Sequence, residues 1–233
     1  MSPGPSETML GNSAVDLTVD IRALTPDELR AATALLAHGM RDNPLHVRVF
    51  GTDPERRGRR LIRFLDPLVA YVHAHGAVLG AYVKGELVGV RGMMEPGGCR
   101  PALMDALRLA SMIVASNPPD GALRILRWLA TWARNDPAWP HWHIGPMTVD
   151  PAYRRRGIGR HLMTHCCRQM DALAATAYLE TDTKTNVAFY ETLGFAVIKH
   201  ERVLGVPNWF MSRPPSHRKT APSDAVPTSE IPR

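Results

Sequence analysis

The segment from Val149 to Gly159 constrains the fold of this 233-residue chain more than any other, because it joins a predicted strand to a predicted helix through glycines. The strand is expected at 141–149. The helix is expected from Ile158, since apolar residues then recur at helical spacing: Leu162, Met163, Cys166, Met170, Leu173. The first amides of a helix lack internal partners, and the helix dipole is positive there. Gly157 and Gly159 keep side chains away from those amides, so the junction predicts an anion-binding loop.

Strands and helices alternate on both sides of this loop, with no internal repeat. The expected strands lie at 17–24, 77–83, 87–93, 141–149, 177–181, 196–203 and 209–212, and the expected helices at 26–36, 54–73, 101–116, 121–133, 158–173 and 186–193. This order predicts one α+β domain over residues 17–214 with a mostly antiparallel central sheet. Residues 1–16 and 215–233 are rich in Pro, Gly, Ser or Thr, and we expect both to be disordered tails.

Composition limits the setting of the protein. A net charge of +6 fits nucleic acid, anionic lipid or an anionic cofactor equally well. Three cysteines form no disulfide framework, and no apolar run approaches the roughly 20 residues that span a bilayer. The N-terminus lacks a secretory signal. We expect a cytoplasmic protein that binds no membrane. The arginines at 56–63 are expected to form a solvated helix face, since no interleaved aromatics mark a nucleic-acid surface.

The anion loop differs from two common phosphate-binding loops. A dinucleotide fingerprint needs a third glycine three positions after Gly159, and a Walker A loop needs Gly-Lys-Ser/Thr; both are absent. What remains is Arg-x-x-Gly-x-Gly between a strand and a helix. This pattern suits a pyrophosphate bound without a metal.

A second segment lies downstream, after the strand that carries Glu180. Asn186 and Tyr190 are four residues apart, so both lie on one face of the short helix. A lone tyrosine on such a helix is usually a core residue. Together with the asparagine and the upstream anion loop, Tyr190 becomes a candidate acid.

These two segments, in this order, resemble the GNAT superfamily of acetyl-CoA-dependent N-acetyltransferases over roughly residues 17–214. With Trp139 before the loop and Trp209 near the end, the layout is most similar to the puromycin N-acetyltransferase-like branch. The resemblance implies a mixed, mostly antiparallel sheet flanked by helices, in which a splayed strand pair holds the coenzyme.

The resemblance also implies a role for each matching position. Backbone groups of Met147 and Val149 would bind the pantetheine arm of the coenzyme, and Asn186 would contact the same arm. Tyr190 would lie at the thioester sulfur, and Glu180 would act as the general base or attract a cationic acceptor. The pyrophosphate would lie against the loop, which comprises Arg154, Arg155, Arg156, Gly157, Ile158 and Gly159.

The implied activity is direct transfer of an acetyl group from acetyl-CoA to a primary amine of a small molecule. An acetyl-CoA-binding sensor module without turnover and a protein or peptide N-acetyltransferase are the alternatives. A phenol has a reference pKa near 10 and a thiol one of about 8.5, so a full proton transfer from Tyr190 to a thiolate costs roughly 2 kcal/mol. No nucleic-acid partner is expected, and a homodimer is compatible with the sequence.

Four histidines raise the question of a metal. His141 and His143 are two apart on a predicted strand, and His161 and His165 are four apart on a predicted helix. No cysteine or acid near them in the sequence completes a ligand set. We therefore expect no metal site.

Overall fold

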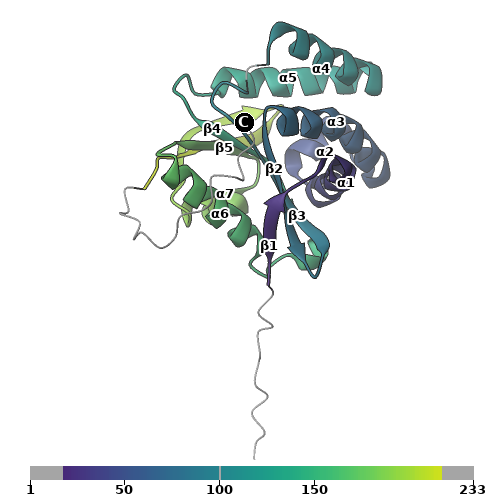
Figure 1. Ribbon diagram of the computed structural model, residues 1–233. Helices are drawn as coiled ribbons and strands as arrows, with labels where there is room; N and C mark the ends of the chain where they lie inside the picture. The colour runs from purple at the N-terminus through teal and green to yellow at the C-terminus, as the bar shows by residue number, and fades with distance from the viewer. Residues whose placement is uncertain (1–17, 100, 217–233) are drawn as a thin grey trace, which may run out of the picture.

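The computed structural model describes residues 18–99 and 101–216. Within these ranges the strands form one sheet in the order β1-β2-β3-β4-β5-β7-β6 (Figure 1). The strands are β1 (Asp20–Ala23), β2 (Gly76–Val83), β3 (Glu86–Met94), β4 (Trp142–Val149), β5 (Ala177–Thr181), β6 (Ala196–Val203) and β7 (Val206–Arg213). Neighbouring strands are antiparallel except β4 and β5, which are parallel. The predicted α+β fold with a mostly antiparallel sheet is confirmed.

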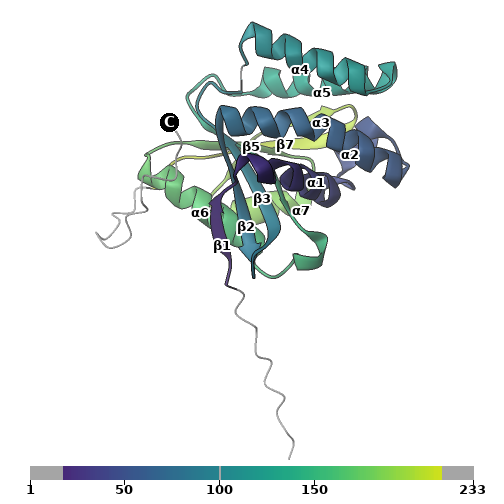
Figure 2. The same cartoon turned by 45° about the vertical axis from the view of Figure 1, so that its right-hand side comes forward.

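Helices cover both faces of the sheet (Figure 2). One face carries α1 (Leu29–Met40), α2 (Pro44–Phe50) and α3 (Pro54–Ala74), and α4 (Leu103–Ser116) and α5 (Pro119–Asn135) pack against this group. The other face carries α6 (Ile158–Ala172) and α7 (Lys184–Glu191). Short 3-10 turns at Pro26–Glu28 and Pro151–Tyr153 precede α1 and α6. The helix predicted at 186–193 corresponds to α7, which begins and ends two residues earlier.

The central strands are apolar on both sides because helices cover both faces of the sheet. In β2, Val78 packs into the core beneath α1 and α3, whereas the next residue, Leu79, packs into the core beneath α6 and α7. Such strands read as continuous apolar runs rather than as alternating patterns. The predicted hairpin at 77–93 is correct, and its turn lies at Lys84 and Gly85.

Two sequence expectations differ from the structure, and the predicted tails lie mostly outside the described residues. The sequence predicts a loop through Asn43 and Pro44 and the next helix only from residue 54, whereas residues 44–50 form α2, with Pro44 in the first turn, where its missing N–H costs nothing. Arg57 was expected on a solvated face, yet its side chain is buried and donates to the carbonyls of Arg41, Gly51 and Thr52. The tail predicted at 1–16 lies outside the described residues, as does 217–233.

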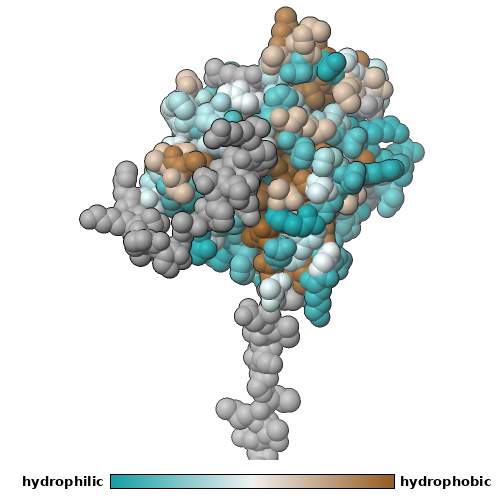
Figure 3. All heavy atoms as spheres, viewed as in Figure 1, coloured by the Kyte–Doolittle hydropathy of each residue, from teal (hydrophilic) through white to brown (hydrophobic). Residues whose placement is uncertain are grey.

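The hairpin formed by α4 and α5 stands above α3 (Figure 1). Hydrophobic side chains gather on this part of the surface (Figure 3), including Leu103, Met104 and Leu107, which are 74%, 68% and 56% exposed. The inner side of the hairpin contributes Ile113, Ile125 and Trp128 to the core. No helix in the described ranges is long and apolar enough to cross a membrane.

The parallel strands β4 and β5 separate soon after they meet. Their register contains only Trp142 opposite Ala177 and His143 opposite Tyr178. Beyond these residues β4 continues along β3 and β5 continues along β7, so the two strands diverge. A register shift in the β3–β4 ladder lies between Arg91 and Met93, next to this separation. The predicted splayed strand pair is confirmed.

Candidate active site

The anion loop lies where β4 ends and α6 begins. Gly157 is the residue before the helix, and its φ of 83° is left-handed, which a residue without a Cβ adopts at little cost. The first helical hydrogen bond runs from the His161 amide to the Gly157 carbonyl at 3.0 Å. The amides of Ile158, Gly159 and Arg160 therefore have no partner within the helix. No side chain caps this helix end, so the amides are available to an anion.

The three arginines of the loop have different surroundings. Arg154 donates from its guanidinium to the Gly39 carbonyl, which belongs to α1, and from its Nε to the Val149 carbonyl at 3.4 Å. Arg155 and Arg156 are exposed, and the Arg156 guanidinium lies 5.3 Å from the centre of the Tyr153 ring. Arg154 therefore fixes the loop against α1, while the other two leave their charge in solvent.

Helix α1, whose Gly39 carbonyl accepts from Arg154, packs closely against β4 at Gly39. A Cβ on Gly39 would lie 2.1 Å from Thr148 Oγ1, a distance that no real contact allows. The close approach is possible only because Gly39 has no side chain. It fixes the end of α1, and hence the Gly39 carbonyl, beside the strand that leads into the anion loop.

The edge of β4 that faces the gap carries backbone groups that do not bond to β3, although the Val149 carbonyl accepts from Arg154 Nε. The Asp150 amide donates to the Val88 carbonyl at 2.8 Å, so this pair is hydrogen-bonded across the β3–β4 ladder. Because hydrogen-bonded and non-hydrogen-bonded pairs alternate in an antiparallel ladder, Thr148 also bonds to β3. Met147 and Val149 then turn their N–H and C=O groups toward the gap. An extended ligand can pair with them as an added strand.

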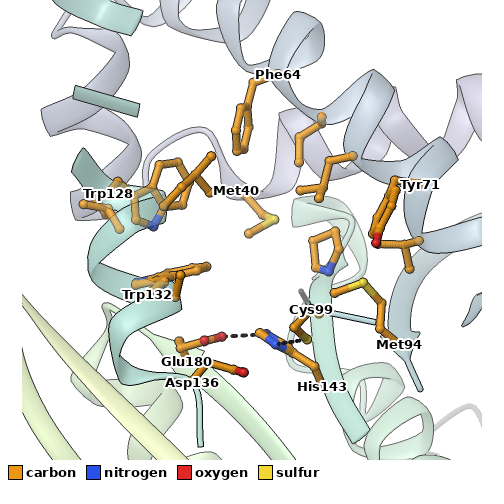
Figure 4. Close-up of a pocket in the computed structure, with 18 of the residues that line it drawn as sticks. Met40, Phe64, Tyr71, Met94, Cys99, Trp128, Trp132, Asp136, His143 and Glu180 are labelled. Atoms are coloured by element: carbon orange, nitrogen blue, oxygen red, sulfur yellow. Dashed lines mark hydrogen bonds and ion pairs between the residues drawn. The ribbon is translucent and has the colours of Figure 1, made fainter. Parts of the chain in front are cut away.

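A cavity of about 530 Å³ lies at the other end of this gap. Its walls come from α1 to α5, β4, β5 and α7, and most lining residues are apolar. Aromatic and methionine side chains dominate the view in Figure 4: Met40, Phe64, Tyr71, Met94, Trp128 and Trp132. Four of the sequence-predicted site residues line the cavity together: Met147, Glu180, Asn186 and Tyr190. The loop residues 154–159 are not among its lining residues.

Tyr190 and Asn186 both face the cavity from α7, as their spacing predicts. Burial among apolar side chains raises the pKa of Tyr190 to about 12. Its ring packs against Phe189 and Phe195, at centroid distances of 5.2 and 5.8 Å. The Asn186 amide donates to Thr181 Oγ1 at 3.3 Å, which ties the helix to the end of β5.

Glu180 faces the cavity from β5. Its carboxylate pairs with His143 of β4, at the point where the two strands begin to separate. The distance between Glu180 Oε2 and His143 Nε2 is 2.7 Å, and the Glu180 side chain is only 3% exposed. Burial alone would lower the pKa of His143. The charge of Glu180 and the hydrogen bonds that His143 makes with Cys99 and Glu180 outweigh that effect and raise the pKa well above its ordinary value.

A polar cluster extends from this pair at the base of the cavity (Figure 4). The Cys99 Sγ lies 2.9 Å from His143 Nδ1, and Asp136 Oδ1 lies 3.1 Å from His141 Nε2. Burial alone would raise the pKa of Cys99, but hydrogen bonds from His141 and His143 lower it. Burial would likewise lower the pKa of His141, yet Asp136, Cys99 and the Trp139 carbonyl raise it to about 9.

The expectation that no cysteine or acid near His141 and His143 completes a ligand set is wrong, because Cys99 and Asp136 both lie beside them. Asp136 is five residues before His141, a local spacing that was overlooked. Cys99 follows β3 and reaches His143 only through the fold. His161 and His165, the other predicted pair, lie on α6.

Other residues of the cavity also escaped the sequence analysis. Asp182 Oδ2 accepts from the Leu45 amide at 2.6 Å and so joins the start of α2 to the end of β5. The four-residue spacing of Trp128 and Trp132 on α5 fits either a core or an acceptor pocket, and in the structure both residues line the cavity. Trp139, in contrast, is 42% exposed, and Trp142 packs in the core beneath α6 and α7.

The fold and the site together define a class of enzyme. A splayed parallel strand pair, with backbone donors at one end and a largely apolar cavity with a carboxylate at the other, suits transfer of a group from an extended anionic donor. A model of the acetyltransferase (GNAT) family matches residues 49–195, which is more than half of the chain. The chain belongs to this family of N-acetyltransferases.

Solved structures share the fold across nearly their whole length. One is described as the histone acetyltransferase HPA2 and related acetyltransferase from Corynebacterium glutamicum; it is 20% identical, with a TM-score of 0.62 over 87% of this chain and 99% of that one. The PaiA N-acetyltransferase of Thermoplasma acidophilum, in complex with coenzyme A, is 13% identical, with a TM-score of 0.53 over 85% and 99%. A polyamine N-acetyltransferase of Drosophila melanogaster, which forms N-acetylagmatine, is 13% identical, with a TM-score of 0.51 over 84% and 100%.

Proposed function

We propose that this protein transfers the acetyl group of acetyl-CoA directly to the primary amine of a small molecule with an apolar body. The observation that carries the proposal is the gap between β4 and β5, which has the anion loop at one end and Glu180 in an apolar cavity at the other. Several relatives of similar fold act on amines according to their descriptions, agmatine among them.

The donor half fits coenzyme A. Amides of Ile158, Gly159 and Arg160 suit the pyrophosphate, because they lie at a helix N-terminus and are not capped. The edge of β4 at Met147 and Val149 suits the amide-bearing pantetheine arm. Bound acetyl-CoA would supply an activated acetyl thioester at the mouth of the cavity.

The acceptor half favours a small amine. The cavity is surrounded by elements of the same chain, and its aromatic and methionine walls suit an apolar or aromatic body. The carboxylates of Glu180 and Asp182 lie in one part of this wall. They would attract one cationic amine and leave the rest of the ligand among apolar side chains. This arrangement favours such an amine over an acceptor charged along its whole length.

The reaction forms a C–N bond as the C–S bond breaks. The nitrogen of the acceptor, once neutral, attacks the thioester carbonyl, and the electron pair of the C–S bond leaves with the sulfur. Glu180, or a water held by it, would take the proton that the nitrogen loses. Tyr190 would donate a hydrogen bond to the leaving sulfur.

The environment of Tyr190 limits what this hydroxyl does. With a pKa of about 12, it is a weaker acid than a free phenol. Full proton transfer to a free thiolate with a reference pKa of about 8.5 would then cost about 5 kcal/mol. A hydrogen bond to the developing thiolate carries no such cost and is worth about 1.5–3 kcal/mol. Tyr190 is therefore assigned to hydrogen bonding rather than to full proton donation.

The test combines coenzyme binding with turnover. Calorimetry should show coenzyme A binding to the wild-type chain, and thiol release from acetyl-CoA should be fastest with arylalkyl amines, slower with polyamines and slowest with peptide N-termini. Mass spectrometry of the product should show acetylation at nitrogen. Coenzyme A binding without turnover of any amine would indicate a sensor module instead, and turnover of peptides alone would indicate a peptide N-acetyltransferase.

A further inference from the structure

The polar cluster at the base of the cavity combines side chains that suit a transition metal. Cys99, Asp136, His141 and His143 each offer one ligand atom, and these atoms all lie within 4.8 Å of one another. Zinc bonds of about 2.0–2.3 Å in a tetrahedron place the ligand atoms about 3.3–3.8 Å apart. The Cys99–His143 pair at 2.9 Å and the Asp136–His141 pair at 3.1 Å are close to that spacing. Small side-chain shifts would bring all four to one ion.

The two imidazoles are also held as metal-binding histidines are. His143 Nε2 lies 2.7 Å from the Glu180 carboxylate, and His141 Nδ1 lies 2.8 Å from the Trp139 carbonyl. A ring nitrogen that donates to such an oxygen leaves the other nitrogen unprotonated in the neutral imidazole, with its lone pair free for a metal. In both residues that other nitrogen is the one that points into the cluster. The Tyr178 ring packs edge-on against both imidazoles and restricts their rotation.

The ligand set selects the kind of ion and the kind of site. A thiolate and two imidazoles favour zinc over magnesium or calcium, which prefer oxygen ligands. Four protein ligands fill a tetrahedron and leave no open position for a substrate, which is typical of structural zinc sites. The ligands are largely removed from solvent, with side-chain exposures of 5% for His141, 9% for Asp136 and 15% for His143. We propose that Cys99, Asp136, His141 and His143 form a structural zinc site.

Such a site would link both ends of one long excursion of the chain. Cys99 follows β3, Asp136 directly follows α5, and His141 directly precedes β4, so one ion would tie the base of the α4–α5 hairpin to the sheet. It would also fix the His143 ring against Glu180. This proposal does not rest on acetyl transfer, because metal binding is measured without any acceptor or coenzyme.

The experiment measures metal directly on the full, untagged chain. After exposure to zinc and dialysis against metal-free buffer, the wild type should retain about one zinc per chain by mass spectrometry of the elements. Cys99→Ser should retain less than about a fifth of that amount, since it removes the thiolate. Cys167→Ser, which removes a buried thiol on α6, and His161→Gln, which breaks the other histidine pair, should retain the wild-type amount.

Two further measurements use the wild type, so the result does not depend on whether Cys99→Ser folds. Cobalt in place of zinc should give the visible bands of a tetrahedral site and a thiolate-to-cobalt charge-transfer band. A strong chelator should lower the thermal unfolding temperature of the wild type and leave that of folded Cys99→Ser unchanged. The proposal is overturned if the wild type retains no zinc and shows no cobalt–thiolate band, or if folded Cys99→Ser binds as much zinc as the wild type.

Discussion

The two ends of the gap between β4 and β5 are built in different ways. At the anion loop the groups proposed to bind the coenzyme are backbone amides of consecutive residues, and most side chains of the loop are exposed. At the cavity the polar groups are side chains, and they come from separate elements: Glu180 from β5, Tyr190 from α7 and His143 from β4. The first end depends on local conformation, whereas the second depends on the tertiary fold.

This difference predicts how each end responds to mutation. Replacing a side chain should harm chemistry at the cavity and leave coenzyme binding intact. At the loop, a change in backbone freedom should matter more than loss of an exposed charge.

Glu180→Gln should have the largest effect on turnover. The change removes the carboxylate that would accept or relay the proton, so kcat/KM should fall by about 10²-fold or more. The dissociation constant of coenzyme A should stay unchanged, because the loop is untouched. Steady-state kinetics and calorimetry measure the two quantities, with Glu55→Gln, on the exposed side of α3, as the control. Equal losses in turnover and coenzyme affinity would contradict the separation of the two ends.

Tyr190→Phe should lower kcat by roughly tenfold to a hundredfold, the value of a hydrogen bond to a charged atom. Because burial raises the pKa of Tyr190 to about 12, the hydroxyl stays protonated as pH rises through the neutral and moderately basic range. The ratio of wild-type to variant rates should therefore be constant from about pH 6 to about pH 10. A ratio that falls to one within that range would show that the hydroxyl titrates with a lower pKa.

Gly157→Ala should weaken coenzyme A binding by roughly tenfold, because a left-handed φ costs a residue with a Cβ about 1–2 kcal/mol. Gly85 is a matched control, since its φ is +82°, against +83° at Gly157, and a Cβ there would meet nothing within 4 Å. Gly85→Ala, in the β2–β3 turn, should lower thermal stability by a similar amount and leave coenzyme affinity unchanged. If both variants bind coenzyme equally well, the conformation of Gly157 is not needed for binding.

Arg156→Ala should have the smallest effect, a rise of about two- to fivefold in the dissociation constant of coenzyme A. Its guanidinium is exposed, so the difference from wild type should shrink further as salt is added. Arg154→Ala should weaken binding more than Arg156→Ala, because Arg154 holds the loop against the Gly39 carbonyl. Calorimetry at two salt concentrations checks both statements, and the opposite order would assign the pyrophosphate contact to Arg156.

The same difference explains what the sequence predicts well. The anion loop is contiguous, and its glycines and the apolar period of α6 are local signals that survive folding. Asn186 and Tyr190 are close enough in sequence for helical spacing to place them on one face. The splayed strands follow from the resemblance that these two segments carry. Much of the fold, the strand-to-helix junction at the anion loop and the shared face of Asn186 and Tyr190 were therefore predictable.

Glu180, Asn186 and Tyr190 were predicted, but the rest of the acceptor half was not, because most of its contacts are made across the fold. Cys99 meets His143 only because α4 and α5 return the chain to its starting point, whereas Asp136 is five residues before His141, a spacing that matches no familiar motif. Asp182 reaches the Leu45 amide across the sheet. Arg57 reads as one member of a charged helix face, yet carbonyls from the preceding loops accept its hydrogen bonds and so allow its burial. Periodicity and spacing report neighbours along one element and carry no information about such pairs.

The segment between β3 and β4, which contains α4 and α5, begins and ends at the same place on the sheet. The chain leaves the sheet after Met94 and returns on the neighbouring strand, where His143 lies opposite Met94. A segment whose ends lie side by side can be exchanged, shortened or extended without moving the strands that it joins. The α4–α5 segment, which supplies part of the cavity wall, is therefore a unit whose replacement need not disturb the strands proposed to bind the coenzyme. We expect a chimera that carries the corresponding segment of another family member to use the same acetyl donor but to acetylate the amine substrate of that relative.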